Sequence, residues 1–297
     1  MRRHAEESLP AFQSKERCMP SNVTISADKL NRLIGTPNCP SLIDVRTHDE
    51  WAAAPLLIPG AQRRPHNDPS QWVAEFIGRS AVAICQDGGQ LSHGVAAWLR
   101  HSGVSAEVLE GGTKDWLKAD LPAVTAARLP PPDRQGRTVW VTRSRPKVDR
   151  IACPWLIRRF VDPRAVFLFV APADIAGVAE QFAATPFDVE GAWFGHRGDA
   201  CTFDVMVQEF GLTTEPLLRL ASIVRAADMD RINASPQAAG LLAASLGLSR
   251  MFSDDLAQLK AGLGLYDAFY RWCRDAVEET HVVHVKRSEG RRTKLST

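Results

Sequence analysis

The stretch SAVAICQDGGQLSHGVAAWLR, from Ser80 to Arg100, decides the fold of the first part of the chain. SAVAIC is a short apolar run of the kind that forms a buried strand, and it ends at Cys85. Two glycines follow, and then a segment with helical spacing of its apolar residues that closes at Gly103, a typical helix stop. The stretch predicts a strand, a loop and a helix, with Cys85 at the carboxyl end of the strand.

Strands and helices of the same kind lie on both sides of this stretch. SLIDVR (Ser41 to Arg46) and SAEVLEGG (Ser105 to Gly112) predict two further buried strands, while HDEWAAA, PSQWVAEFIG and TKDWLKADLP predict helices. This alternation predicts an α/β fold with a doubly wound, mainly parallel sheet. Ligands of such sheets bind at the carboxyl ends of the strands. Cys85 stands at one of these ends.

The loop after Cys85 has the composition of an anion site. Its glycines permit backbone conformations in which successive amides converge, and the helix expected to begin near Ser92 adds its free N–H groups and positive end. We expect these groups to stabilise a thiolate or persulfide on Cys85 and to hold an oxyanion beside it. The expected oxyanion loop consists of Gln86, Asp87, Gly88, Gly89, Gln90, Leu91 and Ser92.

Two histidines lie on the helix that follows this loop. His93 and His101 fall opposite the side expected to carry Val95, Trp98 and Leu99, so we expect both histidines to face solvent.

Residues 22–126 resemble the rhodanese superfamily at several separated motifs. LIDVRTHDEW (Leu42 to Trp51) is similar to the strand and acidic segment of that family, IPGA to its middle motif and EGGTKDW to its closing motif. The resemblance implies sulfur transfer through Cys85. The loop departs from the single-domain sulfurtransferases, because Gln90 and Leu91 stand where an arginine is expected and the loop is one residue longer. This departure weakens the case for thiosulfate as a substrate, since a charged anion contact is missing.

The second part of the chain begins after LPPPDRQGRT (Leu129 to Thr138), whose proline run is typical of a semi-rigid spacer. The predicted organisation is an N-terminal extension over 1–21, the rhodanese-like domain over 22–126, a linker over 127–138, a second domain over 139–280 and a basic tail over 281–297. RTVWVT and AVFLFV predict strands, and the remainder predicts helices. The last helix carries one apolar face, which favours core packing over a coiled coil. The second domain is therefore expected to be a mostly helical α+β fold.

The second domain resembles the C-terminal domain of ChrB-type chromate-resistance proteins. The match lies in Trp140 to Pro163, in ATPFD and in HRGDACTFD (His196 to Asp204). The last segment brings an imidazole, two carboxylates and a thiol within nine residues, a mixed donor set suited to a transition metal. The alternative is a capped helix start with a buried cysteine. The candidate metal ligands are His196, Asp199, Cys201 and Asp204.

Cys153 precedes Pro154, a residue favoured in the first turn of a helix. A helix beginning there would place Cys153 at a positive helix end beside Arg150 and lower its pKa, whereas the neighbouring Ile151 and Trp155 favour a packed thiol. Both interpretations stay open. The basic run from Thr142 to Arg159 suits an anion or nucleic acid, or is a solvated surface.

Composition supports a soluble two-domain protein. Of 297 residues, 45% are hydrophobic and 24% charged, and no apolar stretch is long enough for a signal peptide or membrane span, so we expect a cytoplasmic protein with reduced thiols. The leading hypothesis is a sulfurtransferase-like protein linked to chromate resistance. Its partners would be a sulfur donor and thiol acceptor, or a small oxyanion such as chromate or sulfate, with no cofactor other than a transition metal. The alternative is a non-catalytic chromate or sulfate sensor or transcriptional regulator.

Overall fold

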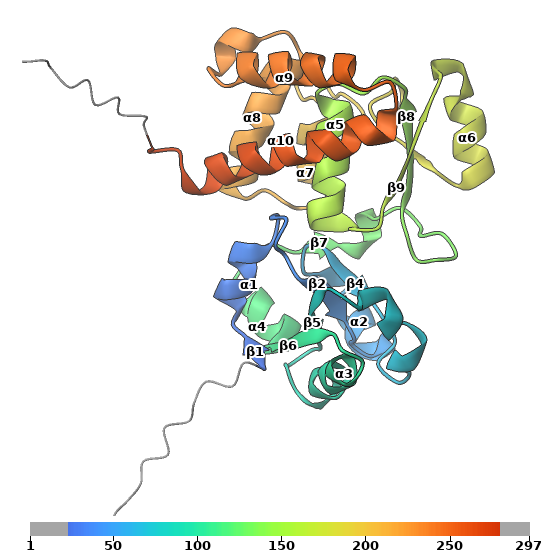
Figure 1. Ribbon diagram of the computed structural model, residues 1–297, viewed down its shortest axis with the longest axis vertical. Helices are drawn as coiled ribbons and strands as arrows, with labels where there is room; N and C mark the ends of the chain where they lie inside the picture. Colours follow the sequence, from blue (N-terminus) through green and yellow to red (C-terminus); the bar gives the residue numbers. More distant parts are fainter. Residues whose placement is uncertain (1–22, 280–297) are drawn as a thin grey trace, which may run out of the picture. The chain divides into compact units, whose positions relative to one another are not determined.

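The computed structural model describes residues 23–279, which form two compact units (Figure 1). The first contains residues 23–34 and 38–121, and the second contains 35–37 and 122–279. The proline-rich segment at 129–138 therefore belongs to the second unit, where Asp133 accepts hydrogen bonds from the backbone and side chain of Arg137. The expected N-terminal extension, with Cys18, lies outside the described residues, as does the expected basic tail.

A parallel five-stranded sheet forms the centre of the first unit, in the order β1-β6-β5-β2-β4. The strands are β1 (Thr24–Ile25), β2 (Ser41–Asp44), β4 (Ala61–Arg63), β5 (Ser80–Ile84) and β6 (Ser105–Leu109), and the short β3 (Leu56–Leu57) stands outside this sheet. Strand β5 is buried over Ala81 to Ile84 and pairs with β2 on one side and β6 on the other. The predicted doubly wound parallel sheet is confirmed, and Cys85 follows its central strand.

In the described part of this unit, the helices that cover the sheet are α1 (Ala27–Leu33), α2 (His48–Ala53), α3 (Gln90–His101) and α4 (Gly112–Lys118). The buried side of α3 carries Val95, Ala96 and Leu99, which share one core with Ile43, Ala83 and Val108 of the strands. Trp98, expected on that side, is instead 50% exposed. The helix predicted over Pro69 to Gly78 is also wrong, because this segment forms two 3₁₀ turns at Pro69–Gln71 and Val73–Phe76. Trp72, with φ −130° and ψ −10°, leaves the helical backbone region between the two turns, and its buried indole donates to the carbonyl of Pro65.

The second unit is built on a parallel three-stranded sheet in the order β10-β8-β9. Strands β8 (Val139–Arg143), β9 (Val166–Val170) and β10 (Thr185–Pro186) form it, while β7 (Val124–Thr125) precedes it. Helix α6 (Ile175–Phe182) lies on one face over Val139 and Val141 (Figure 1). Trp140 points to the other face and packs edge-on against Phe187, Phe194 and Phe210. Alternate residues of β8 thus serve two separate cores.

Helices make up most of the rest of the second unit, which confirms the expected mostly helical α+β fold. They are α5 (Asp149–Leu156), α7 (Thr202–Glu209), α8 (Glu215–Asp228), α9 (Ala238–Met251) and α10 (Asp255–Asp275), and a π-helical turn at Ile157–Val161 continues α5. Trp155 is fully buried among the rings of Phe160, Phe203 and Tyr270. A Cβ on Gly262 would lie 2.6 Å from Ile151, so this glycine allows α5 and α10 to approach closely.

The apolar face of α10 packs into this core. Leu259, Tyr266, Tyr270 and Cys273 are buried, whereas Leu256 at its start and Val277 beyond its end are partly exposed. The core-packing interpretation of this stripe therefore holds for its central residues. Within residues 23–279, no helix combines the length and the apolar character needed to cross a membrane.

Candidate functional sites

Cys85 lies where β5 ends and the loop to α3 begins. Its Sγ is 3.1 Å from Ser92 Oγ, and Ser92 also donates a hydrogen bond to the carbonyl of Gly89. Helix α3 begins at Gln90, two residues before the predicted start, so Ser92 sits in its first turn with its side chain aimed at the sulfur. When a thiolate or persulfide forms, the single hydrogen of this hydroxyl can turn from the Gly89 carbonyl to the sulfur.

The conformation of this loop depends on close contact with the start of α4. Gly88 and Gly112 both have positive φ angles, and a Cβ on Gly112 would lie 2.4 Å from the carbonyl oxygen of Cys85. The amides of Thr113 and Lys114 donate to the carbonyls of Cys85 and Gln86 at 3.0 and 2.9 Å. The two glycine motifs noted in the sequence therefore form one packed unit around the cysteine.

Asp87 makes this loop less suited to anions than its glycines suggest. Its Oδ1 accepts the amide of Gly89 at 3.0 Å and lies 3.6 Å from Cys85 Sγ. One of the amides expected to face an oxyanion is thus already bound to a carboxylate. That carboxylate also places a negative charge beside the sulfur.

Other polar residues near β2 and α3 have structural surroundings. Asp44 and Arg46 form a fully buried ion pair, and Arg46 also donates to the carbonyls of Ala54 and Leu56. His93 and His101 are exposed on α3, as expected.

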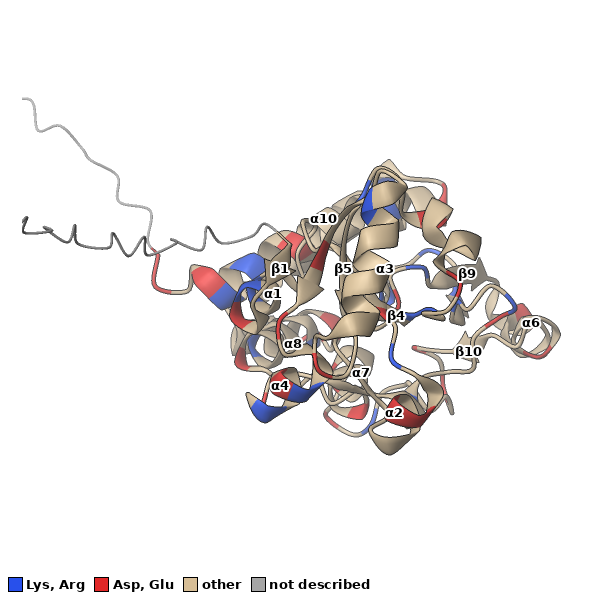
Figure 2. Cartoon of the chain, turned by 90° about the horizontal axis from the view of Figure 1, so that it is seen from below, with Lys and Arg blue, Asp and Glu red and all other residues tan. Residues whose placement is uncertain are grey.

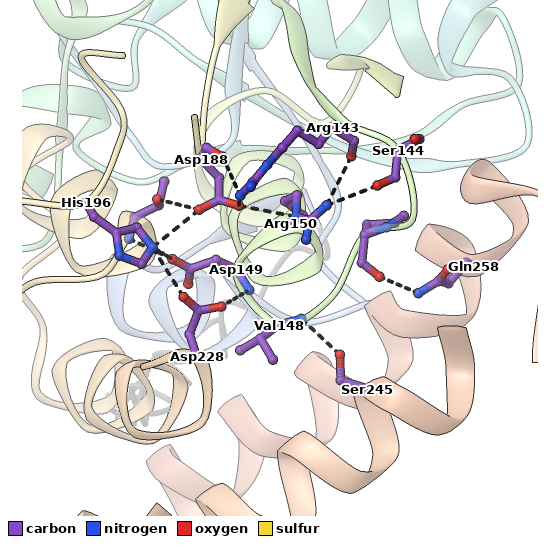
Figure 3. Close-up of polar contacts among 12 residues, drawn as sticks. Arg143, Ser144, Val148, Asp149, Arg150, Asp188, His196, Asp228, Ser245 and Gln258 are labelled. Carbon is purple, nitrogen blue, oxygen red and sulfur yellow. Dashed lines mark hydrogen bonds and ion pairs between the residues drawn. The ribbon is translucent and has the colours of Figure 1, made fainter. Parts of the chain in front are cut away.

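A second constellation of titratable groups lies in the second unit, around His196 (Figure 3). The Nε2 atom of His196 is 3.2 Å from Asp228 Oδ2, 3.3 Å from Asp188 Oδ1 and 3.5 Å from Asp149 Oδ2. Asp149 is the first residue of α5, Asp228 is the last residue of α8, and Asp188 and His196 lie between β10 and α7. Three segments distant in sequence thus converge on one imidazole nitrogen.

The starts of two helices hold these carboxylates. The amide of Thr202, at the start of α7, donates to Asp149 Oδ2 at 2.6 Å, and the amide of Asp149, at the start of α5, donates to Asp228 Oδ1 at 3.4 Å. Helix starts carry partial positive charge, which suits the nearby anions. Asp188 Oδ1 accepts a hydrogen bond from the hydroxyl of Thr202, and its Oδ2 forms ion pairs with the guanidinium groups of Arg143 and Arg150.

Burial and the short distances between these side chains shift the pKa values of Asp149, His196 and Asp228. Burial raises the pKa of Asp149, and burial together with the charge of Asp149 raises the pKa of Asp228 to about 7. The hydrogen bond to Asp149 outweighs partial burial and raises the pKa of His196 to about 9. The carboxylates are thus held close together against their mutual repulsion, with a proton on the histidine as partial compensation.

The metal ligands suggested by the HRGDACTFD segment do not come together. Asp199 is exposed and pairs with Arg231, while Asp204 caps α7 through the amide of Cys201 and pairs with Arg225. Cys201 is buried at the start of α7, as the alternative interpretation proposed. Of the four residues, His196 lies among the three carboxylates and Cys201 lies beside Asp149. Asp199 and Asp204 are held away by their arginine partners.

Cys153 is a packed thiol. Helix α5 begins at Asp149, so Cys153 lies inside the helix, fully buried, rather than at its positive end. Burial and the neighbouring Asp149 raise its pKa well above the usual thiol value. Arg150 pairs with Asp188 and donates to the carbonyl of Ser144, and it does not activate a cysteine.

The basic run from Thr142 to Arg159 is largely paired within the protein. The guanidinium of Arg159 pairs with Asp267 on α10, and those of Arg143 and Arg150 pair with Asp188. The guanidinium of Arg145 donates to the carbonyls of Phe252 and Ser249. Figure 2 shows basic and acidic segments interspersed rather than gathered by sign. Most of these arginines therefore have acidic partners before any external anion arrives.

A cavity of about 440 Å³ opens beside His196 and Asp188, with Arg143 and Glu190 in its lining. His196 retains 41% side-chain exposure, whereas Asp149 behind it has none. The imidazole of His196 therefore lies on the solvent side of these carboxylates.

Sequence spacing signalled only part of this second site. His196 stood out in the sequence, but Asp149 and Asp228 lie 47 and 32 residues from it, and each ends or begins a helix. An acidic residue such as Asp149 is common at the start of a helix, so its local pattern does not mark it as part of a site. Asp228 ends α8, where a negative charge is unfavourable, but its sequence gives no link to His196.

Comparison with known proteins matches each unit to a separate family. Residues 26–119 match the rhodanese-like domain, and residues 140–273 match the C-terminal domain of ChrB. The chain is 36% identical over 144 residues to Protein ChrB of Cupriavidus metallidurans, which covers 48% of this chain and 43% of that protein. The match thus spans less than half of the curated relative.

Two solved structures are similar to the first unit. A protein from Staphylococcus saprophyticus is 32% identical, covers 32% of this chain and 92% of its own, and has a TM-score of 0.29. A rhodanese-like domain protein from Staphylococcus aureus is 28% identical, covers 32% of this chain and 90% of its own, and has a TM-score of 0.28.

Proposed function

We propose that this chain, which joins a rhodanese-like domain to a ChrB C-terminal domain, transfers sulfane sulfur through Cys85 in a pathway of chromate resistance. The observation that carries the proposal is the position of Cys85. Cys85 directly follows the central strand β5, and its Sγ lies 3.1 Å from the Ser92 hydroxyl in the first turn of α3. This arrangement provides a nucleophile with a hydrogen-bond donor and a helix start beside it.

The transfer consists of two displacements without net oxidation. The Cys85 thiolate attacks the outer sulfur of a persulfide donor, the donor's S–S bond breaks, and its inner sulfur leaves as a thiolate. Cys85 then carries a persulfide, to which Ser92 donates its hydroxyl hydrogen. An acceptor thiolate attacks the outer sulfur of that persulfide, and Cys85 leaves as a thiolate.

Asp87 favours donors of low charge. Its carboxylate lies 3.6 Å from Cys85 Sγ and already accepts the amide of Gly89. A dianion such as thiosulfate would meet this charge without the arginine that sulfurtransferase loops usually place there. We therefore favour small persulfides or neutral organic polysulfides as donors. The same carboxylate argues against a chromate or sulfate site at this loop.

The test is intact-mass spectrometry of the full chain after incubation with a polysulfide. The wild-type protein should gain one sulfur atom that a thiol reductant removes, and Cys85→Ser should gain none. Cys39→Ser, a change of the same type in the same unit, serves as the matched control and should behave like the wild type. Equal sulfur uptake by Cys85→Ser would refute the proposal.

A further inference from the structure

The position of His196 is unusual for an ordinary ion pair. An imidazole nitrogen carries at most one N–H and donates one good hydrogen bond, yet His196 Nε2 lies within 3.5 Å of three carboxylates. Atoms from Asp149, His196 and Asp228 all lie within 4.8 Å of one another. One shared proton cannot satisfy all of these groups at once.

The spacing matches the distances between ligands around one metal ion. Ligand atoms about 2.1 Å from a common ion lie roughly 3.0 to 3.4 Å apart in octahedral or tetrahedral geometry. His196 Nε2 is 3.2 Å from Asp228 Oδ2 and 3.5 Å from Asp149 Oδ2. The ligand atoms of Asp149 and Asp228 lie within 4.8 Å of each other, so the three side chains draw together when they bind one ion.

Asp149 supplies an independent observation. It is fully buried, and its Oδ1 makes no hydrogen bond within the described residues, while its Oδ2 accepts the amide of Thr202. An unpaired carboxylate oxygen in a buried position is costly, because the loss of hydration goes uncompensated. Figure 3 shows this carboxylate between His196 and Asp228. A cation bound by this carboxylate, whose Oδ2 faces His196, would offset the cost of burying it.

The local charges favour a cation. Asp149, Asp188 and Asp228 carry three negative charges when ionised, and Arg143 and Arg150, which pair with Asp188, carry two positive charges. With His196 neutral, as it is when it binds an ion, the set carries one net negative charge. A divalent cation would offset the two charges of Asp149 and Asp228, which have no arginine partner among these residues.

We propose that Asp149, His196 and Asp228 bind a divalent first-row transition cation. Carboxylates suit Mn²⁺ and imidazole suits Fe²⁺ and Zn²⁺, so the mixed donors favour this class over Mg²⁺ or Ca²⁺, which take oxygen ligands alone. The cavity beside His196 gives the ion an entry path and leaves its remaining coordination positions open to water or a small ligand. This site is separate from Cys85 and does not depend on sulfur transfer.

The experiment uses the full chain, dialysed against a chelator and then titrated with Mn²⁺. Calorimetry and the electron paramagnetic resonance of free Mn²⁺ should both show one bound ion per chain. Asp228→Asn and His196→Gln each remove a ligand and should weaken binding at least about tenfold. Asp199→Asn changes an acidic residue three positions from His196 that pairs with Arg231 outside the group, so it should bind Mn²⁺ like the wild type.

Several results would overturn the proposal. These are absence of Mn²⁺ binding by the wild-type protein, unchanged binding by both ligand variants, and displacement of Mn²⁺ by an equal concentration of Mg²⁺. Thermal unfolding without metal checks that the variants fold. Because Asp228→Asn relieves repulsion between neighbouring carboxylates, its melting temperature without metal should not fall. If it fails to fold, His196→Gln at the more exposed position decides the question.

Discussion

At the scale of single residues, Asp87 is the charged side chain beside Cys85. It takes the place of an external anion as the partner of the Gly89 amide and brings a negative charge close to the sulfur. In the proposed sulfur transfer, this residue would select among donors without taking part in the displacement itself.

Asp87→Asn should raise the rate of sulfur transfer from thiosulfate severalfold, because asparagine keeps the oxygen that accepts the Gly89 amide but removes the charge. The rate with a neutral organic polysulfide should change much less. Initial rates with both donors, measured at low and high salt, check this, since the difference should shrink as salt screens the charge. An equal increase for both donors would mean that Asp87 acts on the fold of the loop instead.

The buried pair of Asp44 and Arg46 makes a second prediction at this scale. Asp44→Asn leaves the Arg46 guanidinium without its charge partner in a site closed to solvent, and should lower the free energy of unfolding by about 3 to 5 kcal/mol. Glu107→Gln, which removes a partly exposed partner of Lys29, should cost no more than about 1 kcal/mol. Urea unfolding of the two variants gives the comparison, and equal effects would contradict it.

At the scale of elements, the contact between the Cys85 loop and the start of α4 organises the first site. Gly112 has a φ of +57°, and its Cα hydrogen faces backbone atoms of Cys85, Gln86 and Gly88. The cysteine loop keeps its conformation only where α4 begins with a residue that lacks a Cβ.

Gly112→Ala should destabilise the protein by about 2 kcal/mol or more, because it combines backbone strain with a clash against the Cys85 carbonyl. It should also slow persulfide formation. Gly94→Ala, inside α3, should instead stabilise by about 1 kcal/mol, because its added methyl group would meet no other atom within 4 Å. Melting temperatures and intact-mass time courses separate the two, and a harmless Gly112→Ala would show that the contact is dispensable.

The elements most readily predicted from the sequence were those with the strongest local patterns. Strand β5 is a continuous apolar run after Ser80, β2 and β6 carry buried apolar pairs, and α3 has both helical spacing and a glycine stop. Prediction failed over Pro69 to Gly78, where the non-helical backbone of Trp72 divides the segment into two 3₁₀ turns. Pro154 suggested a helix start, although α5 begins at Asp149 and tolerates the proline inside.

At the scale of the whole molecule, the two candidate sites differ in how the chain assembles them. Residues adjacent in sequence form the Cys85 loop, so its glycines and Ser92 were recognisable before the fold was known. The site around His196 is completed by Asp149 from the start of α5 and by Asp228 from the end of α8. Only tertiary packing brings them together, and no local spacing predicts such a set.

The thiols of the described residues should differ sharply in reactivity. Burial raises the pKa of Cys153, of Cys201 and, to about 11, of Cys273, so these thiols should resist alkylation until the protein unfolds. Prior treatment with a small neutral oxidant such as hydrogen peroxide should lower the later labelling of Cys85, at the end of β5, and leave those three unchanged. Mass spectrometry of labelled peptides reports each site. Loss of labelling at Cys153 before Cys85 would move the reactive centre to the second unit.

Val148, just before Asp149, links the start of α5 to two other helices. Its φ of +31° is strained for a β-branched residue, and hydrogen bonds hold it there: its amide donates to Ser245 on α9, and its carbonyl accepts from Tyr266 on α10, both at 2.9 Å. Opening of either helix releases this strained residue and with it Asp149. Amide hydrogen exchange in α9 and α10 should therefore slow when a ligand binds Asp149, because the bound ligand raises the free energy of the shared opening.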